Sequence, residues 1–229
     1  MESNFLNIKK ILSALPLYFN KNTLLNVFYF TGGIIIFICG IIIYGIIINN
    51  REINIGEAMR LKGFSKIENP WISVERKNYS LSIYEDTVFI KTYRANFGRN
   101  INSPKCREGD YGTPVGEYRI CSIDTVSKYH KFLYLNYPNL TDATEALRKG
   151  IISQKQYDKL SFEYYYGDCP EKESALGGDI GIIGIGQYNG IFKNLPFVFN
   201  WTDGSISVSN EDIDEIYSVI KKGTKVVIK

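Results

Sequence analysis

The sequence predicts a domain that is mainly β, or α+β with its helices segregated from the strands, preceded by one transmembrane helix. Three observations support this fold class. A charge-free apolar run of 22 residues lies near the N-terminus. From residue 71 onward, short β-branched and aromatic runs alternate with polar turns, as in a strand-rich domain. Helical periodicity after the apolar run is confined to a few short segments.

The apolar run covers residues 27–48 and contains no Lys, Arg, Asp or Glu. At about 1.5 Å per residue it rises about 33 Å, enough to cross a hydrocarbon core of about 30 Å. Its length and uniformity argue against a buried core helix or strand. A cleavable signal peptide is disfavoured because residues 49–52 (Asn-Asn-Arg-Glu) offer no small-residue cleavage site. We therefore expect an attached membrane anchor.

The expected organisation is a cytoplasmic segment 1–26, a transmembrane helix 27–48, a juxtamembrane linker 49–70 and a domain 71–229. Apolar positions at helical spacing within residues 5–15 predict a short helix on the membrane surface. Basic residues flank the span on both sides, so the charge bias does not decide the topology.

The domain itself carries no net charge. The formal charge of +3 belongs to residues 1–51, and residues 52–229 hold 23 basic and 23 acidic side chains. A neutral domain lacks the positive field that holds a phosphate backbone. We therefore expect no nucleic-acid partner.

The chain has one histidine, His130, and four cysteines, Cys39, Cys106, Cys121 and Cys169, with no C-x-x-C pair. A zinc site needs several such ligands at short spacing. We therefore expect no metal. Disulfides among the last three cysteines stay open, provided that the domain is exported.

Strands are predicted from period-two apolar patterns and the turns between them. They are expected at residues 72–75, 79–84, 88–93, 117–123, 131–136, 179–185, 206–208 and 225–228. The first three form a meander, and the glycine-interrupted strand 179–185 is expected to be central. The polar, glycine-bearing segment 95–116 is too long for an idle connection.

Two helices are predicted after residue 71. The first covers 141–150, with Thr141 or Asp142 as its cap, and the second follows a cap at Ser209 or Asn210. The apolar face of the second helix consists of Ile213, Ile216, Tyr217 and Ile220. Residues 54–65 are read as a short helix or a linker. The run 164–166 (Tyr-Tyr-Tyr) is interpreted as an exposed strand or loop in preference to a lid or sugar-stacking surface.

Three segments carry a family resemblance. They read KCREGDYGTPVGEYRI at 105–120, GGDIGIIG at 177–184 and WTDGSISVSN at 201–210. In this order and spacing they resemble the L,D-transpeptidase catalytic domain (YkuD family), in its YafK-like branch. The similarity covers about residues 71–229. A lone T-P-x-G is a weak signal, but the three segments together are specific.

The resemblance implies a β-sandwich with peripheral helices, exported and acting on peptidoglycan without a cofactor. In the family a Cys thiolate attacks a carbonyl of the peptide stem, a His activates the thiol, and an amine or water releases the product. It also implies a single-pass protein of the bacterial inner (cytoplasmic) membrane. Its C-terminal domain would lie on the periplasmic or extracytoplasmic side.

Both chemical positions of the family are replaced here. Ile183 occupies the His position, and Ser205 occupies the Cys position. A Cys thiol with a pKa near 8.5 is partly ionised at neutral pH, whereas a Ser hydroxyl needs an adjacent base. Loss of one triad member costs roughly 10³–10⁶-fold in rate. The sequence therefore predicts a pseudoenzyme.

Several other side chains are candidates to replace the missing base. His130 is a weak candidate to serve Ser205, and a structural or substrate-facing role is the favoured interpretation. A Ser–Lys pair would need Lys193 or another desolvated Lys. Glu173 and Asp179 would need raised pKa values, and Asp179 suits a structural role in its Gly-Gly-Asp turn. Cys169 is interpreted as a disulfide candidate or a bystander.

The walls of the family's groove are better retained than its catalyst. The matching residues are Gly184, Gly186, Tyr188, Trp201, Thr202 and Gly204. Trp201 equally suits the edge of a core.

The preferred hypothesis is a membrane-anchored, non-catalytic protein of the cell envelope that binds peptidoglycan stem peptides or a cell-wall partner. One alternative is an active transpeptidase or amidase with Ser205 as its nucleophile. Another is a partner-docking module of a membrane complex.

Overall fold

The computed structural model of this chain describes residues 21–229, apart from 50–51, 167–168, 171–173 and 196–198. The chain divides into two compact units, residues 1–50 and 51–229, and each is described by itself.

The apolar run forms one helix, α2 (Lys21–Asn49), which contains the whole predicted span 27–48. The stretch Asn22–Ile47 is long and apolar enough to cross a membrane. A signal sequence near the N-terminus meets the same two criteria. The hydroxyl of Thr31 donates to the carbonyl of Val27 at 2.8 Å, so this polar group is satisfied inside the helix. The surface helix expected before this span lies outside the described residues.

A short helix, α3 (Ile55–Leu61), begins the second unit. The side chain of Asn54 caps its first turn, and Ile55 and Met59 are buried. The backbone N–H of Ile55 also donates to Glu215 Oε2 at 3.1 Å. These contacts attach α3 to the C-terminal part of the domain.

The domain is built on an eight-stranded mixed sheet in the order β3-β2-β1-β8-β4-β5-β6-β7. The strands are β1 (Pro70–Glu75), β2 (Ser80–Glu85), β3 (Val88–Arg94), β4 (Gly116–Ser127), β5 (His130–Leu135), β6 (Gly181–Ile183), β7 (Ile206–Ser207) and β8 (Lys225–Ile228). The pairs β1–β8 and β6–β7 are parallel and the others antiparallel. Every predicted strand is present, but β6 lies next to the edge strand β7, so the expectation that it is central was wrong.

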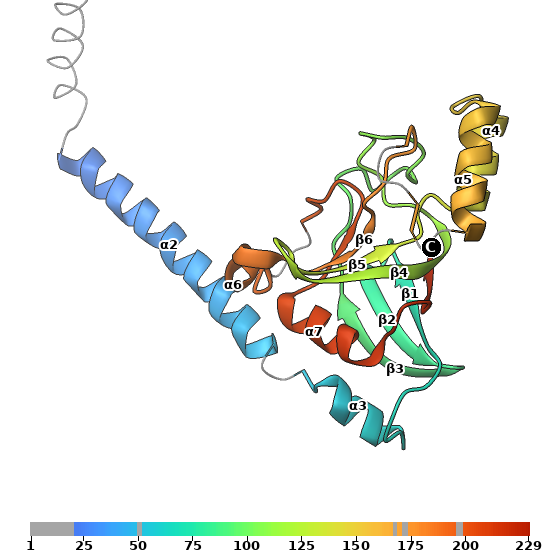
Figure 1. Cartoon of the computed structure of the whole chain (residues 1–229). Helices are drawn as coiled ribbons and strands as arrows, with labels where there is room; N and C mark the ends of the chain where they lie inside the picture. The colour runs from blue at the N-terminus through green and yellow to red at the C-terminus, as the bar shows by residue number, and fades with distance from the viewer. Residues whose placement is uncertain (1–20, 50–51, 167–168, 171–173, 196–198) are drawn as a thin grey trace, which may run out of the picture. The chain divides into compact units, whose positions relative to one another are not determined.

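Strand β4 connects two halves of the sheet, β3-β2-β1-β8 on one side and β5-β6-β7 on the other (Figure 1). Its first four residues pair with β8, and its later residues pair with β5. A single hydrophobic cluster takes fully buried residues from both halves and from α7, including Ile72, Leu133 and Ile213. This strand-rich domain with peripheral helices agrees with the predicted L,D-transpeptidase-like fold class.

The helix α4 (Leu140–Arg148) starts one residue before the predicted range. Its cap is Asn139, whose side chain accepts from the N–H groups of Thr141 at 2.8 Å and Asp142 at 3.0 Å. The Asp142 carboxylate accepts in return from Asn139 N at 2.9 Å. The expected cap at Thr141 or Asp142 was wrong because Asn139 completes this reciprocal capping box.

The tyrosine run 164–166 lies in a helix, α5 (Gln154–Tyr166), so its interpretation as a strand or loop was wrong. The helix lies beside α4 (Figure 1). Leu160 is its buried residue, while all three tyrosines are exposed. The helix contacts α4 but has no wide apolar stripe. Its hydrophobic periodicity therefore gave little indication of a helix.

The final helix, α7 (Asn210–Val219), is capped by Ser209, whose hydroxyl accepts from Asp212 N at 3.0 Å. Its Ile213 and Ile216 are buried as predicted, but Tyr217 is exposed. Two short elements before it, η2 (Gly186–Tyr188) and α6 (Asn189–Phe192), were not predicted.

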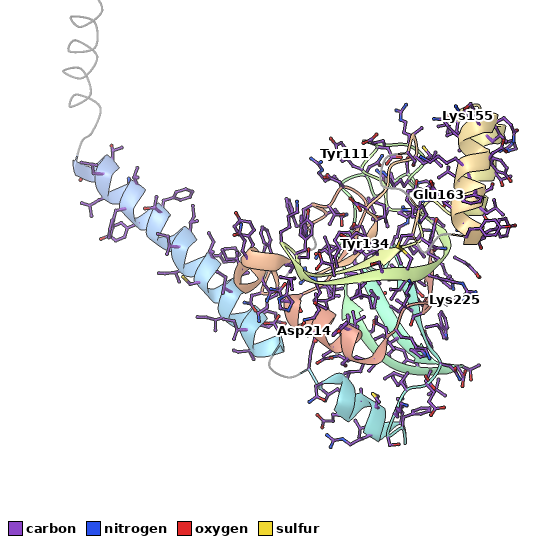
Figure 2. The ribbon with its side chains drawn as sticks, in the orientation of Figure 1. Tyr111, Tyr134, Lys155, Glu163, Asp214 and Lys225 are labelled. Carbon is purple, nitrogen blue, oxygen red and sulfur yellow. A yellow bond between two sulfur atoms is a disulfide. The ribbon has the colours of Figure 1, made fainter. Side chains whose placement is uncertain are left out.

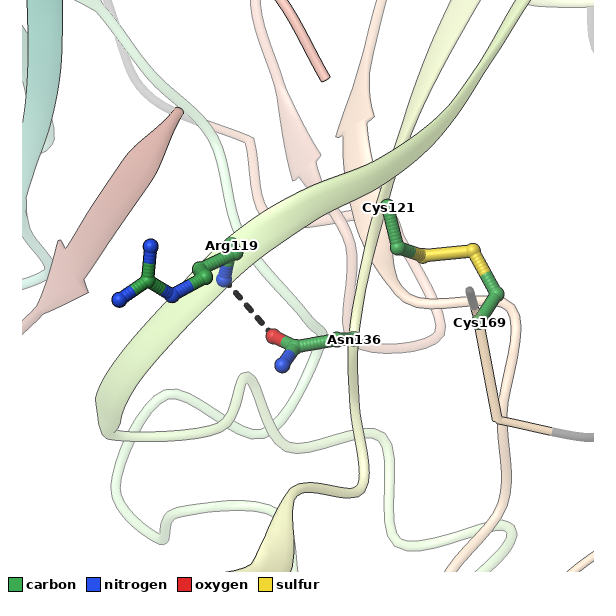
Figure 3. Close-up of a disulfide and its surroundings, with 4 residues drawn as sticks. All are labelled: Arg119, Cys121, Asn136 and Cys169. Atoms are coloured by element: carbon green, nitrogen blue, oxygen red, sulfur yellow. Dashed lines mark hydrogen bonds between the residues drawn. A yellow bond between two sulfur atoms is a disulfide. The ribbon is translucent and has the colours of Figure 1, made fainter. Parts of the chain in front are cut away.

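A disulfide joins Cys121 of β4 to Cys169 (Figure 3). Their Cα atoms are 5.3 Å apart, within the ordinary range for a disulfide. Cys106 and Cys39 are unpaired and exposed. The structure thus selects one of the pairings that the sequence left open, and such bonds persist in oxidising compartments.

Candidate functional site

A groove of about 790 Å³ opens where the long loop 95–116 meets β5, β6 and the turn before β7. Ser205 and Ile183, the two predicted chemical positions, both line it, as do Trp201 and Thr202. The structure therefore brings together four of the predicted site residues.

The turn before β7 sets the position of Ser205. The hydroxyl of Thr202 donates to the carbonyl of Ser205 at 2.5 Å and accepts from Gly204 N at 3.3 Å. Gly204 has φ +131°, a conformation that L side chains rarely adopt. The threonine of the W-T-D-G motif thus holds the backbone on either side of the serine.

The long loop runs against this turn. Gly98 pairs with Thr202 in an isolated bridge, and its N–H donates to the Thr113 hydroxyl at 3.0 Å. A Cβ on Gly98 would lie 2.1 Å from the carbonyl oxygen of Tyr111, closer than any side chain allows. Thr113 of the T-P-V-G motif therefore connects two segments of the loop, around residues 98 and 113, at the groove.

A buried ion pair holds the rest of the loop. Lys105 Nζ lies 3.3 Å from Asp110 Oδ1, and the two side chains are 4% and 11% exposed. The Asp110 carboxylate also accepts from the N–H groups of Cys106, Arg107 and Gly112. Burial by itself raises the pKa of Asp110, but these backbone hydrogen bonds and Lys105 outweigh it and lower the pKa.

The hydroxyl of Ser205 is buried and held by two backbone groups. Its Oγ accepts from Gly181 N at 3.2 Å and donates to the carbonyl of Asp179 at 3.4 Å. Among the described residues, these are its hydrogen-bond partners. No side chain that the structure describes accepts a hydrogen bond from the Ser205 hydroxyl.

Ile183 places a hydrocarbon side chain at the groove. It is the last residue of β6 and 2% exposed, and it pairs with Phe132 on one side and Ser207 on the other. An aliphatic side chain can neither accept a proton nor orient an imidazole. The β6 side of the groove is therefore apolar at this point.

His130 is engaged elsewhere. Its Nε2 lies 2.8 Å from Asp214 Oδ1 of α7, and Lys131 also pairs with Asp214. Burial raises the pKa of Asp214, but the hydrogen bonds from Lys131 and His130 outweigh it and lower the pKa. The residues that line the groove include Ser205 and not His130.

The side chains of the other candidate bases likewise form no hydrogen bond with Ser205 among the described residues. Lys193 Nζ lies 2.5 Å from Glu211 Oε1. Asp179 offers Ser205 its carbonyl, and Glu173 lies outside the described residues. Lys105 is the buried lysine of the groove, but its ammonium donates to Asp110 and has no acceptor capacity.

Four of the predicted wall residues do not line the groove: Gly184, Gly186, Tyr188 and Gly204. A Cβ on Gly184 would lie 2.5 Å from the carbonyl oxygen of Tyr129, and Gly186 has φ +76°. These two glycines therefore allow a close approach of backbones. Tyr188 is 56% exposed on η2.

Three aromatic residues that form a wall of the groove with Trp201 were not predicted. Phe132 and Tyr134 stack with ring centres 4.0 Å apart, and Tyr129 lies 6.0 Å from Trp201. All four line the groove. Phe132 and Tyr134 are two residues apart on β5, so the period-two pattern contained the signal that they share a face.

A charged rim was also missed. Arg99 stacks on the ring of Tyr111 at 3.8 Å and pairs with Asp203 at 2.5 Å. This contact bridges the long loop to the turn before Ser205. The two partners are 104 residues apart, so sequence spacing gave no indication of it.

The model of the YkuD L,D-transpeptidase catalytic domain matches residues 69–228. The chain belongs to this family. Its domain is thus of a cell-wall enzyme type, while the equivalence of Ile183 and Ser205 to the family's His and Cys stays a prediction.

Similar solved structures include the helical cell shape determining protein Pgp2 from Campylobacter jejuni, with 19% identity and a TM-score of 0.46 over 70% of this chain and 47% of that one. Bd1075 from Bdellovibrio bacteriovorus has 20% identity and a TM-score of 0.44 over 71% and 48%. L,D-transpeptidase 3 from Mycobacterium tuberculosis has 12% identity and a TM-score of 0.40 over 70% and 60%. The match thus spans about half the length of Pgp2 and Bd1075. No curated protein is significantly similar in sequence.

Proposed function

We propose that this L,D-transpeptidase-like domain is a pseudoenzyme that binds peptidoglycan stem peptides, or a cell-envelope protein, without transferring acyl groups. One observation carries the proposal. The Ser205 hydroxyl donates to a backbone carbonyl, beside Ile183 and with no side-chain base hydrogen-bonded to it.

The physical argument concerns the proton of the nucleophile. A serine hydroxyl attacks a carbonyl only when a positioned base removes its proton. The backbone carbonyl of Asp179 accepts a hydrogen bond but is far too weak a base for this task. Two missing catalytic groups reduce the rate by roughly 10³–10⁶-fold or more.

The groove retains the means to bind a peptide. Its aromatic wall offers apolar contact, and charges of both signs surround it. The cations are Arg99, Lys105 and Lys128, and the anions are Glu108, Asp179 and Asp203. This balance suits a ligand that carries both amino and carboxyl groups, as a stem peptide does.

Helix α2 and the disulfide support an extracytoplasmic location for the domain, which is part of this proposal. We take α2 as a membrane anchor with the N-terminus in the cytoplasm. The Cys121–Cys169 bond is of the kind that persists outside the cytoplasm, where peptidoglycan lies. A topology assay with reporters fused at each end checks this placement, and a cytoplasmic C-terminus would contradict it.

The test of inactivity uses the full-length chain in detergent micelles with a soluble peptidoglycan digest. We expect mass spectrometry to detect neither cross-linked nor trimmed products. A product that disappears in the Ser205→Ala variant would overturn the proposal and favour the active transpeptidase or amidase.

The test of binding uses tryptophan fluorescence, because the chain contains only Trp71 and Trp201. In a Trp71→Phe variant, Trp201 reports on the groove alone. We expect its emission to change saturably with a synthetic, sugar-free stem tetrapeptide. An unchanged emission would contradict peptide binding and favour the partner-docking alternative.

Restoring the family's two residues tests whether these positions are equivalent. We expect an Ile183→His and Ser205→Cys double variant to form a covalent acyl adduct with the stem tetrapeptide: the thiolate replaces the amine of one peptide bond, and the residue beyond that bond leaves as a free amine. Ser205→Cys alone is the matched control, because it has the thiol without its base. A folded double variant that forms no adduct would contradict the equivalence.

A further inference from the structure

A second pocket, of about 700 Å³, lies on the sheet formed by β1, β8 and the start of β4. It shares no lining residue with the groove. Figure 2 shows Lys225, which lines this pocket, apart from Tyr111 of the groove. The function proposed above does not use it.

One wall of this pocket is a tryptophan that is supported from behind. Trp71 stacks on Tyr84 with ring centres 4.5 Å apart and planes inclined by 15°, and Tyr84 in turn contacts Phe89 edge-on. The indole N–H donates to the carbonyl of Asp86 at 2.6 Å, which fixes the ring.

The strand register shows on which side of the indole the pocket lies. Trp71 of β1 pairs with Tyr84 of β2 on one side and with Lys225 of β8 on the other. Tyr84 covers the face toward β2, so the opposite face points toward β8. The pocket lies on that side, where Lys225 and Val227 of β8 line it.

The remaining lining is polar and charge-balanced. Lys225 Nζ lies 2.8 Å from Glu117 Oε2, and Lys221 Nζ donates to the carbonyl of Glu68 at 3.2 Å. The lining side chains with charge are Glu68, Asp86 and Glu117 against Lys221, Lys225 and Lys229. A ligand with a large net charge gains little from such a balance, whereas the hydroxyl and amide groups of an uncharged ligand find both donors and acceptors here.

We propose that this pocket is a saccharide-binding site, in which a pyranose ring stacks on the open face of Trp71. The C–H bonds of a pyranose face carry partial positive charge and complement the negative face of the indole. Its equatorial hydroxyl and amide groups then reach the ring of carboxylates and ammonium groups. The choice of an N-acetylated glycan as ligand rests on the proposed function, because the stem peptides are carried on such a glycan.

The two tryptophans make the test specific. A full-length Trp201→Phe variant, in a detergent without a sugar headgroup, leaves Trp71 as the only tryptophan. We expect tri-N-acetylchitotriose to change its emission saturably. In the Trp71→Phe variant, we expect the same sugar to leave the Trp201 emission unchanged.

Calorimetry with the same sugar measures affinity. We expect Trp71→Ala to weaken binding by about tenfold or more, the effect of losing one stacking contact. Lys225→Ala, an exposed change that preserves the fold, should weaken it several-fold. Tyr165→Ala is the matched control, because Tyr165 is an exposed aromatic residue on α5, and it should leave binding unchanged.

Two outcomes would overturn the inference. One is the absence of any heat or emission change with the sugar. The other is sugar binding that survives in Trp71→Ala and is lost in Trp201→Ala, which would place the sugar in the groove. Failure of the proposed function appears separately, as loss of the Trp201 response to the sugar-free tetrapeptide.

Discussion

The two pockets of this domain are built in opposite ways. The groove is framed by a long loop and a turn, and its ion pair, Lys105–Asp110, has side chains 4% and 11% exposed. The second pocket lies on paired strands, and its ion pair, Lys225–Glu117, has side chains 45% and 68% exposed. In the groove, charge holds the backbone in place. On the sheet, strand pairing holds the backbone, and the charges are available to a ligand.

The carboxylates of the two ion pairs, Asp110 and Glu117, differ in their hydrogen-bond partners. Asp110 accepts from three backbone N–H groups that no strand partner satisfies. Glu117 belongs to β4, whose backbone is paired with β8. Changes in the two pockets should therefore affect different properties: stability in the groove, and affinity on the sheet.

The largest effect is expected for Asp110→Asn. It leaves the Lys105 ammonium buried without its charged partner, and we expect the free energy of unfolding to fall by about 3–5 kcal/mol. Denaturant unfolding measures it. The matched control is Asp203→Asn, in an exposed pair with Arg99, for which we expect less than about 1 kcal/mol. Equal losses in the two variants would break the comparison.

Asp142 shows what a carboxylate without a paired cation does in this domain. It is partly buried, as Asp110 is, but among the described residues no cation pairs with it. Burial raises its pKa to about 6 despite hydrogen bonds from Asn139 and Tyr118. A carboxyl with a raised pKa stabilises the fold at low pH, and this contribution is lost as pH rises through about 6.

We therefore expect Asp142→Asn to gain stability relative to the native chain as pH rises. The difference in unfolding free energy between the two should change by about 2–3 kcal/mol between pH 4 and 7. Denaturant unfolding at several pH values measures it. A difference that does not vary with pH would show that the carboxyl is not held in a desolvated state.

The packing of the groove loop predicts a smaller loss for Gly98→Ala. The added methyl group would meet the carbonyl of Tyr111, and overpacking of this kind costs about 1–3 kcal/mol. Gly190→Ala is the control, because a Cβ there meets nothing within 4 Å. Thermal unfolding of both variants checks the prediction, and an unchanged Gly98→Ala would mean that the loop is free to move away.

The smallest effect on stability is expected for Glu117→Ala. Its ion pair with Lys225 is exposed, so the loss should be below about 1 kcal/mol and should shrink further in salt. The sugar affinity should nevertheless fall several-fold. A large loss of stability with unchanged affinity would reverse the assignment of the two pockets.

The sequence predicted the strands well, because they alternate and are bounded by turns. Residues such as Ile72 and Val74 of β1 follow a pattern that needs no knowledge of their partners. The Ser209 cap and the acidic first turn of α7 were equally local signals. Local signals failed for α5, whose aromatic residues are exposed.

The candidate site was predicted only in part. Ser205, Ile183, Trp201 and Thr202 do meet in one groove. The placement of His130 against Asp214, 84 residues away in the chain, lay beyond any spacing argument.

The amino-acid sequence by itself determined the apolar helix, the positions of the strands along the chain and the family, since each can be read from residue patterns along the chain. Only the tertiary structure decided that Cys121 pairs with Cys169, that Arg99 pairs with Asp203, and that Trp71 stacks on Tyr84. These features depend on which distant segments come into contact. That is set by the packing of the whole core, and no local pattern in the chain encodes it.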